Sequence, residues 1–525
     1  MMKVYNNVIR QPLDTIFYYR DCISFGEILD MKKIAVLSLG ILTILFTGCN
    51  QKSDTGIFVK APCPFEVPEG LEESGKFSYG YMKVPEFHKN PDGKTIEVAV
   101  AVFKCRSDIA THEPLVLNTG GPGMSNMDNF VPDLFGELGD LLLDNRDVVI
   151  IELRGLKYSK PNLFCPEIDN LQMYLVDKNL SIDETMGLYM DTLKVVYNRF
   201  KSEGVNLSAF NDYEIADDIV YVMDQFDYQK FSIFGSSFGT LVAQHLLLNH
   251  SDHLVSTAMN AVVDINRGLP GMHSNSINRL DSIFSTCEND IELNQAYPDL
   301  KNRFLALIKR LNETPETLDV TYAKDGKTYK ALLTGNKLAV WVFGFMYWDA
   351  QLPSTLHTIL SGDYSLISNN PGMMFPLQDF SNGLSLSIIL AESSNFADED
   401  IPLDNEYVDF VKGCGTMIFT PYFLNHAKHI WQVNDLQDRN LSIVSEVPTL
   451  MFSGELDHVC PPEYATELSK KLKNSYLYIF PGIAHSPIDF GPCGRLMMKE
   501  FLDNPTKAPD SSCVQEFHSG FNLPS

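Results

Sequence analysis

The sequence predicts a doubly wound α/β fold, in which a mostly parallel sheet carries helices on both faces and a mainly helical insertion interrupts the chain. Short unbroken apolar runs before residue 264 are typical of strands buried on both sides. Strand and helix patterns alternate again after residue 448, whereas residues 265–447 show mainly helical periodicity. We therefore expect a core in two parts, residues 49–264 and 448–525, and a helical cap formed by residues 265–447.

The first part of the core opens with an alternating pattern. Apolar residues at period two over residues 95–103 predict a strand with one buried face. The runs at residues 115–117 and 148–151 predict strands covered on both faces. Apolar residues recur at helical spacing over residues 215–226 and precede a strand at residues 231–234.

The second part of the core repeats this order, with strands predicted over residues 449–453 and 476–480 around a helix over residues 462–472. Within the insertion, helical patterns lie around residues 277–284, 303–311 and 338–348. A hairpin turn is predicted at Asp325-Gly326.

The N-terminal residues 1–48 have the features of an export signal. Lys32 and Lys33 precede an apolar run over residues 34–46, which is too short for a bilayer span of about 20 residues but fits a signal-peptide core. The ending at Cys49 resembles a bacterial lipoprotein signal, which implies lipidation of Cys49 and Met31 as the true start. We expect the rest of the chain to be exported and anchored by lipid to the bacterial cell envelope, either in the periplasm or at the cell surface. The alternative is an uncleaved N-terminal anchor.

Composition excludes some classes of partner. With 67 acidic and 41 basic side chains the net charge is -26, which disfavours nucleic acid. No CxxC pair occurs, and His426 with His429 forms an HxxH without HExxH, so ordinary surface histidines are expected and neither a metal nor a cofactor is implied. The oligomeric state is not predicted.

Disulfides are expected from an oxidising compartment. Eight cysteines remain after Cys22 and Cys49 are set aside, and eight cysteines allow 105 pairings, so the count alone does not give the connectivity.

The strongest local signal is Gly235-Ser236-Ser237-Phe238-Gly239, a GxSxG motif expected by chance roughly 0.15 times in such a chain. A strand ends at Phe234 and a helix over residues 240–249 follows, as a nucleophile elbow requires. Glycines leave room for a serine held in a tight strained turn. Ser237 is the predicted nucleophile.

A serine nucleophile needs a histidine base and a carboxylate that orients it. Asp457 and His485 each follow a predicted C-terminal strand, at the sheet edge where such folds place their sites. We predict Asp457 as the acid and His485 as the base. The alternative is that Asp457 caps the helix at Pro461-Pro462 and His485 is an ordinary loop residue.

Glycines also follow the strand at residues 115–117, in Thr119-Gly120-Gly121-Pro122-Gly123. Bare backbone N–H groups there can serve an oxyanion hole together with the N–H of the residue after the nucleophile. Gly121 and Phe238 are the predicted donors, and an ordinary Gly-Pro loop is the alternative.

Together these motifs carry a family resemblance. The sequence resembles α/β-hydrolase serine peptidases of the prolyl and tripeptidyl aminopeptidase group. The motifs that carry the resemblance are GGPG at residues 120–123, ELRG at 152–155, Ser159 with PNLFCPE at 161–167, GSSFG, GELD and GIAH. The C-terminal residues Cys493, FLDNP at 501–505 and Ser512-Cys513 resemble that group too. The sequence departs from the family pattern at Thr119, Glu152 and Lys157, none of which is a triad position.

The resemblance implies further roles. It pairs Cys493 with Cys513 and places Glu392, in the cap, where the family's glutamate binds a substrate ammonium; a solvated helix-face glutamate is the alternative. Ser393 follows Glu392 where relatives often carry a second acid. Cys63 with Cys105 and Cys287 with Cys414 are conjectured pairs, while Cys165 and Cys460 are equally compatible with free, buried thiols.

The sequence therefore predicts an exported, lipid-anchored serine hydrolase, aminopeptidase-like in its action on short peptides. One alternative keeps the triad but acts on esters or other acyl compounds, because pocket shape and not fold sets specificity. Another is a non-catalytic surface lipoprotein that captures peptides or glycans.

Overall fold

The computed structural model describes residues 56–348, 351–392, 406–436 and 441–523. The predicted signal segment and Cys49 lie outside these residues. None of the helices in the described part combines the length and the apolar character needed to span a bilayer.

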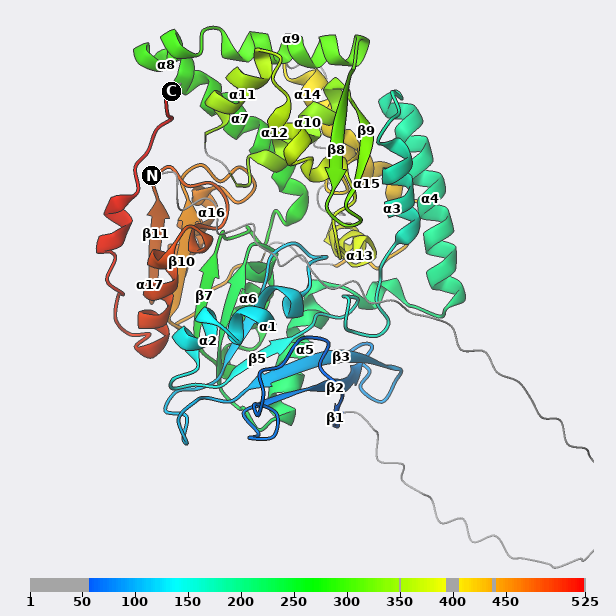
Figure 1. Cartoon of the computed structure of the whole chain (residues 1–525). Coiled ribbons are helices and arrows are strands. Elements are labelled where there is room, and N and C mark those ends of the chain that lie inside the picture. Colours follow the sequence, from blue (N-terminus) through cyan, green and yellow to red (C-terminus); the bar gives the residue numbers. More distant parts are fainter. Residues whose placement is uncertain (1–55, 349–350, 393–405, 437–440, 524–525) are drawn as a thin grey trace, which may run out of the picture. The chain divides into compact units, whose positions relative to one another are not determined.

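A nine-stranded sheet forms the core, in the order β1-β2-β3-β5-β4-β6-β7-β10-β11. The first three strands pair antiparallel and β3 pairs antiparallel with β5, whereas β5, β4, β6, β7, β10 and β11 run parallel (Figure 1). The strands are β1 Phe58–Lys60, β2 Phe77–Pro85, β3 Thr95–Phe103, β4 Leu115–Asn118, β5 Val148–Ile151, β6 Phe231–Ser236, β7 Leu254–Asn260, β10 Thr449–Gly454 and β11 Ser475–Phe480. The mostly parallel sheet is confirmed.

The strand β3 differs from its prediction in burial. Its alternating pattern predicts one buried face, yet Ala99, Ala101 and Phe103 on the other face are also buried. They pack in a second core cluster with Phe77 of β2, so small and aromatic residues fill a face that the pattern assigns to solvent. The prediction of a single buried face is therefore wrong.

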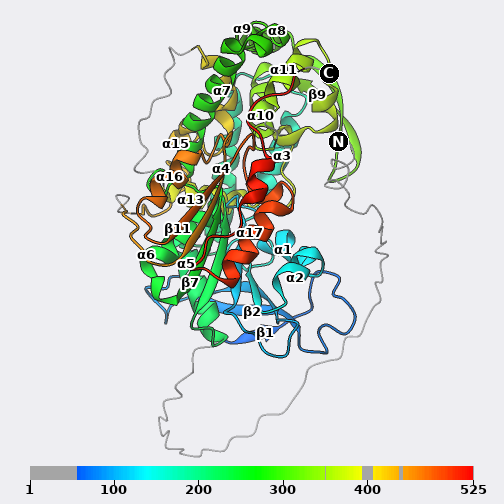
Figure 2. The same cartoon turned by 90° about the vertical axis from the view of Figure 1, so that its left-hand side faces the viewer.

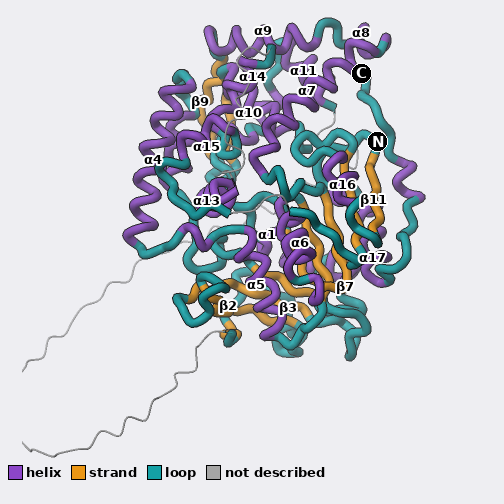
Figure 3. Tube along the Cα trace, turned by 180° about the vertical axis from the view of Figure 1, so that it is seen from behind, coloured by secondary structure: helices purple, strands orange, loops and turns teal. Residues whose placement is uncertain are grey.

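Helices cover both faces of the sheet. The helices α5, α6 and α16 pack on the face that carries Val100, Val116 and Ile233, and α1, α2 and α17 pack on the opposite face with Phe103 and Leu117. Figure 3 shows α5 and α6 against the strands from behind. These helices are α1 Asn126–Leu134, α2 Glu137–Leu142, α5 Asp212–Gln225, α6 Phe238–Asn249, α16 Pro462–Ser469 and α17 Pro492–Asp503.

The insertion between β7 and β10 is mainly helical, as predicted, and contains one hairpin. Its described helices are α7 Met272–Asn289, α8 Ile291–Ala296, α9 Leu300–Glu313, α10 Gly335–Phe345, α11 Leu352–Leu360, α12 Ser365–Asn369, α13 Asn382–Glu392, α14 Val408–Gly413 and α15 Pro421–Ala427. The hairpin pairs β8 Glu316–Tyr322 with β9 Lys327–Leu333, which confirms the predicted turn.

Two helices outside the predicted insertion join the cap, namely α3 (Pro166–Leu175) and α4 (Ile182–Ser202). The Leu332 N–H donates to the Val176 carbonyl at 2.9 Å, and Lys337 Nζ donates to the Leu175 carbonyl at 2.8 Å. In Figure 1 both helices lie beside β9 and α15. The cap therefore draws on residues before the nucleophile, which the predicted boundary at residue 264 assigns to the core.

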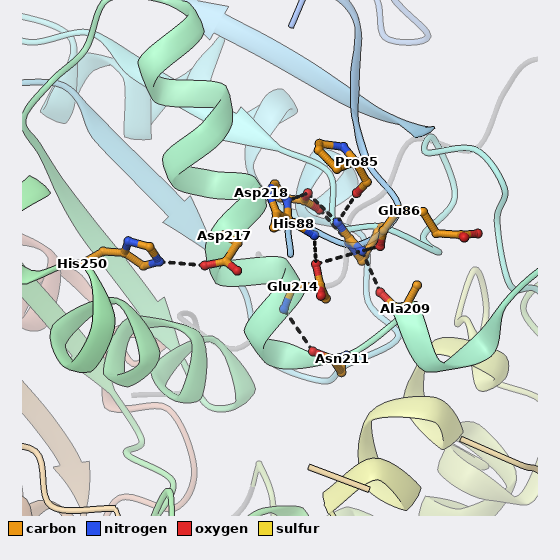
Figure 4. A network of polar contacts seen from close by, with 10 residues as sticks. Pro85, Glu86, His88, Ala209, Asn211, Glu214, Asp217, Asp218 and His250 are labelled. Carbon is orange, nitrogen blue, oxygen red and sulfur yellow. Dashed lines mark hydrogen bonds and ion pairs between the residues drawn. The ribbon is translucent and has the colours of Figure 1, made fainter. Parts of the chain in front are cut away.

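A buried charge network fixes the turn after β5. Arg154, which is fully buried, donates to Asp218 on α5 at 2.6 and 2.8 Å and to the carbonyls of Pro85, Glu86 and Ala209. His88 also contacts Asp218, at 2.7 Å (Figure 4). Burial alone would raise the pKa of Asp218, but Arg154 and His88 hold it below its ordinary value.

The C-terminal segment begins at a disulfide and crosses the molecule. Cys493 of α17 is bonded to Cys513. Beyond it, Ser519 Oγ donates to Glu455 Oε2 at 2.7 Å, and the Asn522 carbonyl accepts the Tyr297 hydroxyl of the cap at 2.6 Å. Figure 2 shows this segment, in red, running from α17 toward the cap. We call residues 514–523 the C-terminal strap.

The other described cysteines carry free thiols: Cys63, Cys105, Cys165, Cys287, Cys414 and Cys460. The conjectured pairs Cys63–Cys105 and Cys287–Cys414 are therefore wrong. Cys105 instead contacts the Ser107 carbonyl at 3.2 Å, and Cys414 is completely buried at the end of α14.

Candidate active site

The Gly235–Gly239 motif forms a tight turn between β6 and α6. Ser237 has φ +52° and ψ −117°, a conformation that side-chain-bearing residues rarely adopt. A Cβ on Gly235 would lie 2.3 Å from the Gly239 carbonyl oxygen, and a Cβ on Gly239 would lie 2.6 Å from that of Asn118. Both glycines are thus required by close backbone contacts, and they hold Ser237 at the carboxyl end of β6.

Asp457 and His485 meet at the same edge of the sheet. Asp457 follows β10, His485 follows β11, and Asp457 Oδ2 lies 2.8 Å from His485 Nδ1. Asp457 Oδ1 accepts the N–H groups of Val459 at 3.0 Å and Cys460 at 2.8 Å. An ionised carboxylate there makes Nδ1 the donor and leaves Nε2 free to take a proton.

The alternative roles for these two residues do not fit the structure. Pro461, not Asp457, occupies the N-cap of α16. His485 does lie in a loop, but it is only 6% exposed and contacts Asp457, so it is no ordinary loop residue.

Cys460 connects the Asp457–His485 pair to the nucleophile. Its sulfur and the ligand atoms of Asp457 and His485 lie within 4.8 Å of one another, and its thiol hydrogen-bonds with Ser237. Burial raises the pKa of this thiol well above its ordinary value. The thiol therefore stays protonated beside Ser237. The sequence gives no signal for this contact except the position of Cys460 three residues after Asp457.

Asp457, Cys460 and His485 also make up the one cluster among the described residues that could hold a metal ion. Both oxygens of Asp457 already accept hydrogen bonds, from His485 and from two backbone N–H groups. This donor set fits an orienting acid and its base.

The glycine loop after β4 lies against the nucleophile. A Cβ on Gly120 would lie 2.5 Å from Ser237 Cβ, so only a glycine fits there, and Gly121 has φ +73°. Phe238 is the first residue of α6, where a backbone N–H has no helical acceptor. Of the two predicted oxyanion donors, Phe238 thus follows Ser237 in the chain and Gly121 follows Gly120, which contacts Ser237.

A buried carboxylate supports this loop from below. Glu152 Oε2 accepts Ser125 Oγ and the Met127 N–H, both at 3.1 Å, at the start of α1. Burial raises the pKa of Glu152 to about 7. Glu152 therefore places a group that titrates near neutral pH at the first turn of α1.

The cap contacts the catalytic loops through Tyr347, which follows α10. The His485 N–H donates to the Tyr347 carbonyl at 3.2 Å, and the two rings meet edge to face with centroids 5.2 Å apart. The Tyr347 ring also packs on His458 at 4.6 Å. Burial lowers the pKa of His458 to about 3, so this imidazole is neutral and contributes only packing contacts.

The start of α13 is fixed to the core beside the glycine loop. The Ser381 N–H donates to the Gly123 carbonyl at 2.9 Å, and Ser381 Oγ donates to the Gly155 carbonyl at 3.0 Å. Lys157 Nζ bridges Asp128 of the core and Asp379 of the cap at 3.1 and 3.0 Å. Lys157, a departure from the family pattern, thus connects core and cap.

Glu392 ends the same helix and is completely buried, so the interpretation of a solvated helix-face glutamate is wrong. Its Oε2 accepts the Leu269 N–H at 3.3 Å. Leu269 lies just before α7, whose Ser276 contacts the His458 carbonyl at 3.4 Å. These contacts connect Glu392 to the loop that carries Asp457.

Two family models match the chain. One, described as the alpha/beta hydrolase fold, matches residues 113–318, and one described as a TAP-like protein matches residues 420–513. Comparison with curated proteins finds no match.

Solved structures with similar folds cover most of the chain at low identity. MGS-M2, an alpha/beta hydrolase from a Medee basin deep-sea metagenome library, is 12% identical, with 79% of this chain and 97% of that one covered and a TM-score of 0.36. Proline iminopeptidase from Mycobacterium smegmatis is 15% identical, with 81% of this chain and 99% of that one covered and a TM-score of 0.35. Esterase EaEST from Exiguobacterium antarcticum is 14% identical, with 78% of this chain and 96% of that one covered and a TM-score of 0.33. Likenesses at these scores do not choose between a peptidase and an esterase.

The strand order, the tight turn between β6 and α6 and the two matching models agree that the chain has the α/β-hydrolase fold, with a C-terminal region similar to TAP-like proteins.

Proposed function

We propose that this chain is a serine hydrolase that releases residues or short peptides from the N-terminus of peptides. The observation that carries the proposal is the hydrogen-bonded pair Asp457–His485, which lies at the same end of the parallel strands as Ser237, held at φ +52°. Nucleophilic acyl transfer needs a serine of this kind together with an imidazole that a carboxylate orients.

The chemistry follows from these positions. Ser237 Oγ attacks the scissile carbonyl carbon while His485 Nε2 takes the hydroxyl proton. The N–H groups of Gly121 and Phe238 stabilise the oxyanion. His485 then gives the proton to the leaving amine, which departs as the acyl-enzyme forms. Water attacks the ester, His485 accepts its proton and returns it to Ser237, and the carboxylic product leaves.

Specificity for a free N-terminus rests on Glu392 in this proposal. A buried carboxylate favours an ammonium group strongly, because little water competes for either charge. Glu392 has no exposed surface and ends a helix that is bonded at its start to the glycine loop. Export and lipidation at Cys49 are part of the proposal, and they rest on the sequence of residues 32–49.

A fluorophosphonate probe tests the nucleophile. We expect labelling of the wild-type chain and none of Ser237→Ala, and a loss of turnover of about 10⁴-fold or more in Ser237→Ala and His485→Ala. Equal labelling of the wild type and Ser237→Ala, or no labelling of either, would favour a non-catalytic capture protein.

Chromogenic amides with free and acetylated N-termini, run beside simple esters, test the substrate class. We expect only the free amides to be cleaved efficiently, and Glu392→Gln to lower kcat/KM on them about 10- to 100-fold, the size of one charge-assisted hydrogen bond. Ester turnover by Glu392→Gln is the control and should stay near wild type. Equal cleavage of free and acetylated amides, or turnover of esters alone, would contradict the aminopeptidase.

A further inference from the structure

Asn260 occupies a central place that the triad does not explain. It is the last residue of β7, the strand between β6, which leads to Ser237, and β10, which leads to Asp457. It lies opposite Ser236 in the β6–β7 ladder and opposite Phe452 in the β7–β10 ladder. Its side chain has no exposed surface.

The contacts of Asn260 reach both the nucleophile turn and the histidine loop. Its carbonyl accepts the N–H of Ser237 at 2.8 Å. Its Nδ2 donates to Ser236 Oγ at 3.0 Å and to Ser486 Oγ at 2.6 Å. The two bonded hydroxyls belong to the residue before the nucleophile and the residue after the base.

The chemistry of these contacts calls for an amide. The Ile488 N–H can only donate, and it reaches Asn260 Oδ1 at 3.3 Å, which fixes the oxygen on that side. Both hydrogens of Nδ2 are then directed at the two serine hydroxyls. The hydrogen bonds of this buried amide offset the free-energy cost of removing it from water. An apolar residue would instead leave the Ile488 N–H without a hydrogen-bond acceptor.

The histidine loop needs such support, because Ser486 has φ +65°, a left-handed conformation that a residue with a side chain holds only when its surroundings enforce it. The hydrogen bond from Asn260 Nδ2 to the Ser486 hydroxyl helps to hold the Ser486 backbone in this conformation. The backbone conformation of Ser486 in turn affects the orientation of the neighbouring His485.

We propose that Asn260 is a positioning residue that holds the Ser237 turn and the His485 loop at the distance needed for proton transfer. This inference rests on the proposed function. A proton passes between heavy atoms at about 2.6–3.2 Å, and a misplacement of about 1 Å can cost roughly 100-fold in rate. Asn260 touches neither substrate nor reacting atoms, so its loss should lower kcat and leave KM nearly unchanged.

The experiment compares Asn260→Ala, Asn260→Asp and the control Thr257→Val in the full chain. Thr257 lies three residues earlier on β7, is fully buried, and bonds Thr449 at 2.8 Å, away from the catalytic loops. The readouts are the fluorophosphonate labelling rate of Ser237, kcat and KM on a substrate that the wild type turns over, and Tm. We expect Asn260→Ala to lower labelling and kcat about 10- to 100-fold with KM within about twofold, and Thr257→Val to lower Tm only.

Asn260→Asp tests the same geometry if the alanine variant does not fold. The Ser236 and Ser486 hydroxyls can turn to donate to a carboxylate, so labelling should be faster than in Asn260→Ala. The added charge favours imidazolium at His485, so the acid limb of kcat/KM should move to higher pH. Asp457, Cys460, His458 and Tyr347 are the other titratable groups that face His485, and they are the same in every variant.

The inference is overturned if Asn260→Ala labels at the wild-type rate, if Thr257→Val loses as much labelling as Asn260→Ala, or if Asn260→Asp leaves both labelling and the pH profile unchanged. Absence of labelling in the wild type would overturn the proposed function, and this inference with it.

Discussion

Two potential nucleophiles, the Ser237 hydroxyl and the Cys460 thiol, share one buried site. A thiol reacts as its thiolate, and burial raises the pKa of Cys460, which keeps it in the unreactive form. A serine instead needs only a base within reach, and His485 is the base in the proposed mechanism. The burial that makes the thiol inert also strengthens the interactions on which the serine depends.

Glu152 gives a prediction about pH. Its pKa is about 7 in the folded chain against 4.5 in the unfolded chain, so between these values the folded state holds a proton that the unfolded state has lost. The contribution of Glu152 is therefore fully present below about pH 4.5 and is lost as pH rises through 7. We expect wild type to lose about 2–3 kcal/mol relative to Glu152→Gln between pH 5 and pH 8, measured by urea unfolding. A constant difference across this range would contradict the prediction.

Sequence and structure differ most in the residues that support the site. Ser237, Asp457 and His485 each lie in a local motif at a strand end, so the pattern predicts them, and the Asp457–His485 contact is present. Asn260 and Tyr347 lie in no such motif. Their contacts form only when distant segments meet, which single-sequence periodicity does not report.

At the scale of elements, the Arg154 network fixes helix α5 to the end of β2 and to the turn after β5. Arg154 and Asp218 are both buried, so removal of either deprives the other buried charge of its nearest partner. We expect Asp218→Asn to lower the free energy of unfolding by about 3 kcal/mol or more, measured by denaturant titration. The control is Asp191→Asn, which breaks the exposed pair with Lys194 on α4 and should cost less than about 0.5 kcal/mol. Equal losses in the two variants would refute this account.

Strand and helix positions in the core follow from the sequence because apolar periodicity and burial agree there. The prediction fails where burial comes from the tertiary structure, as on the second face of β3, which packs in one cluster with α1 and α2. It fails again for α3 and α4, whose amphipathic patterns do not say whether a sheet or a cap receives them. The apolar period of a segment predicts that one of its faces is buried, but it does not specify which element covers that face.

For the whole molecule, the disulfide Cys493–Cys513 restrains the chain before the C-terminal strap. The bond closes a loop of 20 residues, which corresponds to about 3 kcal/mol in the chain-entropy model. We expect Cys513→Ser to lower the free energy of unfolding by about this amount and to make stability insensitive to dithiothreitol. The free thiol Cys63 supplies the matched control, Cys63→Ser, which should keep the wild-type response. A wild type whose Tm does not change on reduction would contradict this prediction.

The long separation between Ser237 and His485, 248 positions, has a consequence for biosynthesis. A ribosome adding about 5–20 residues per second needs roughly 10–50 s to pass from one to the other. During that time the nascent chain carries Ser237 without His485. In the proposed mechanism, hydrolytic activity therefore arises only once translation has passed His485.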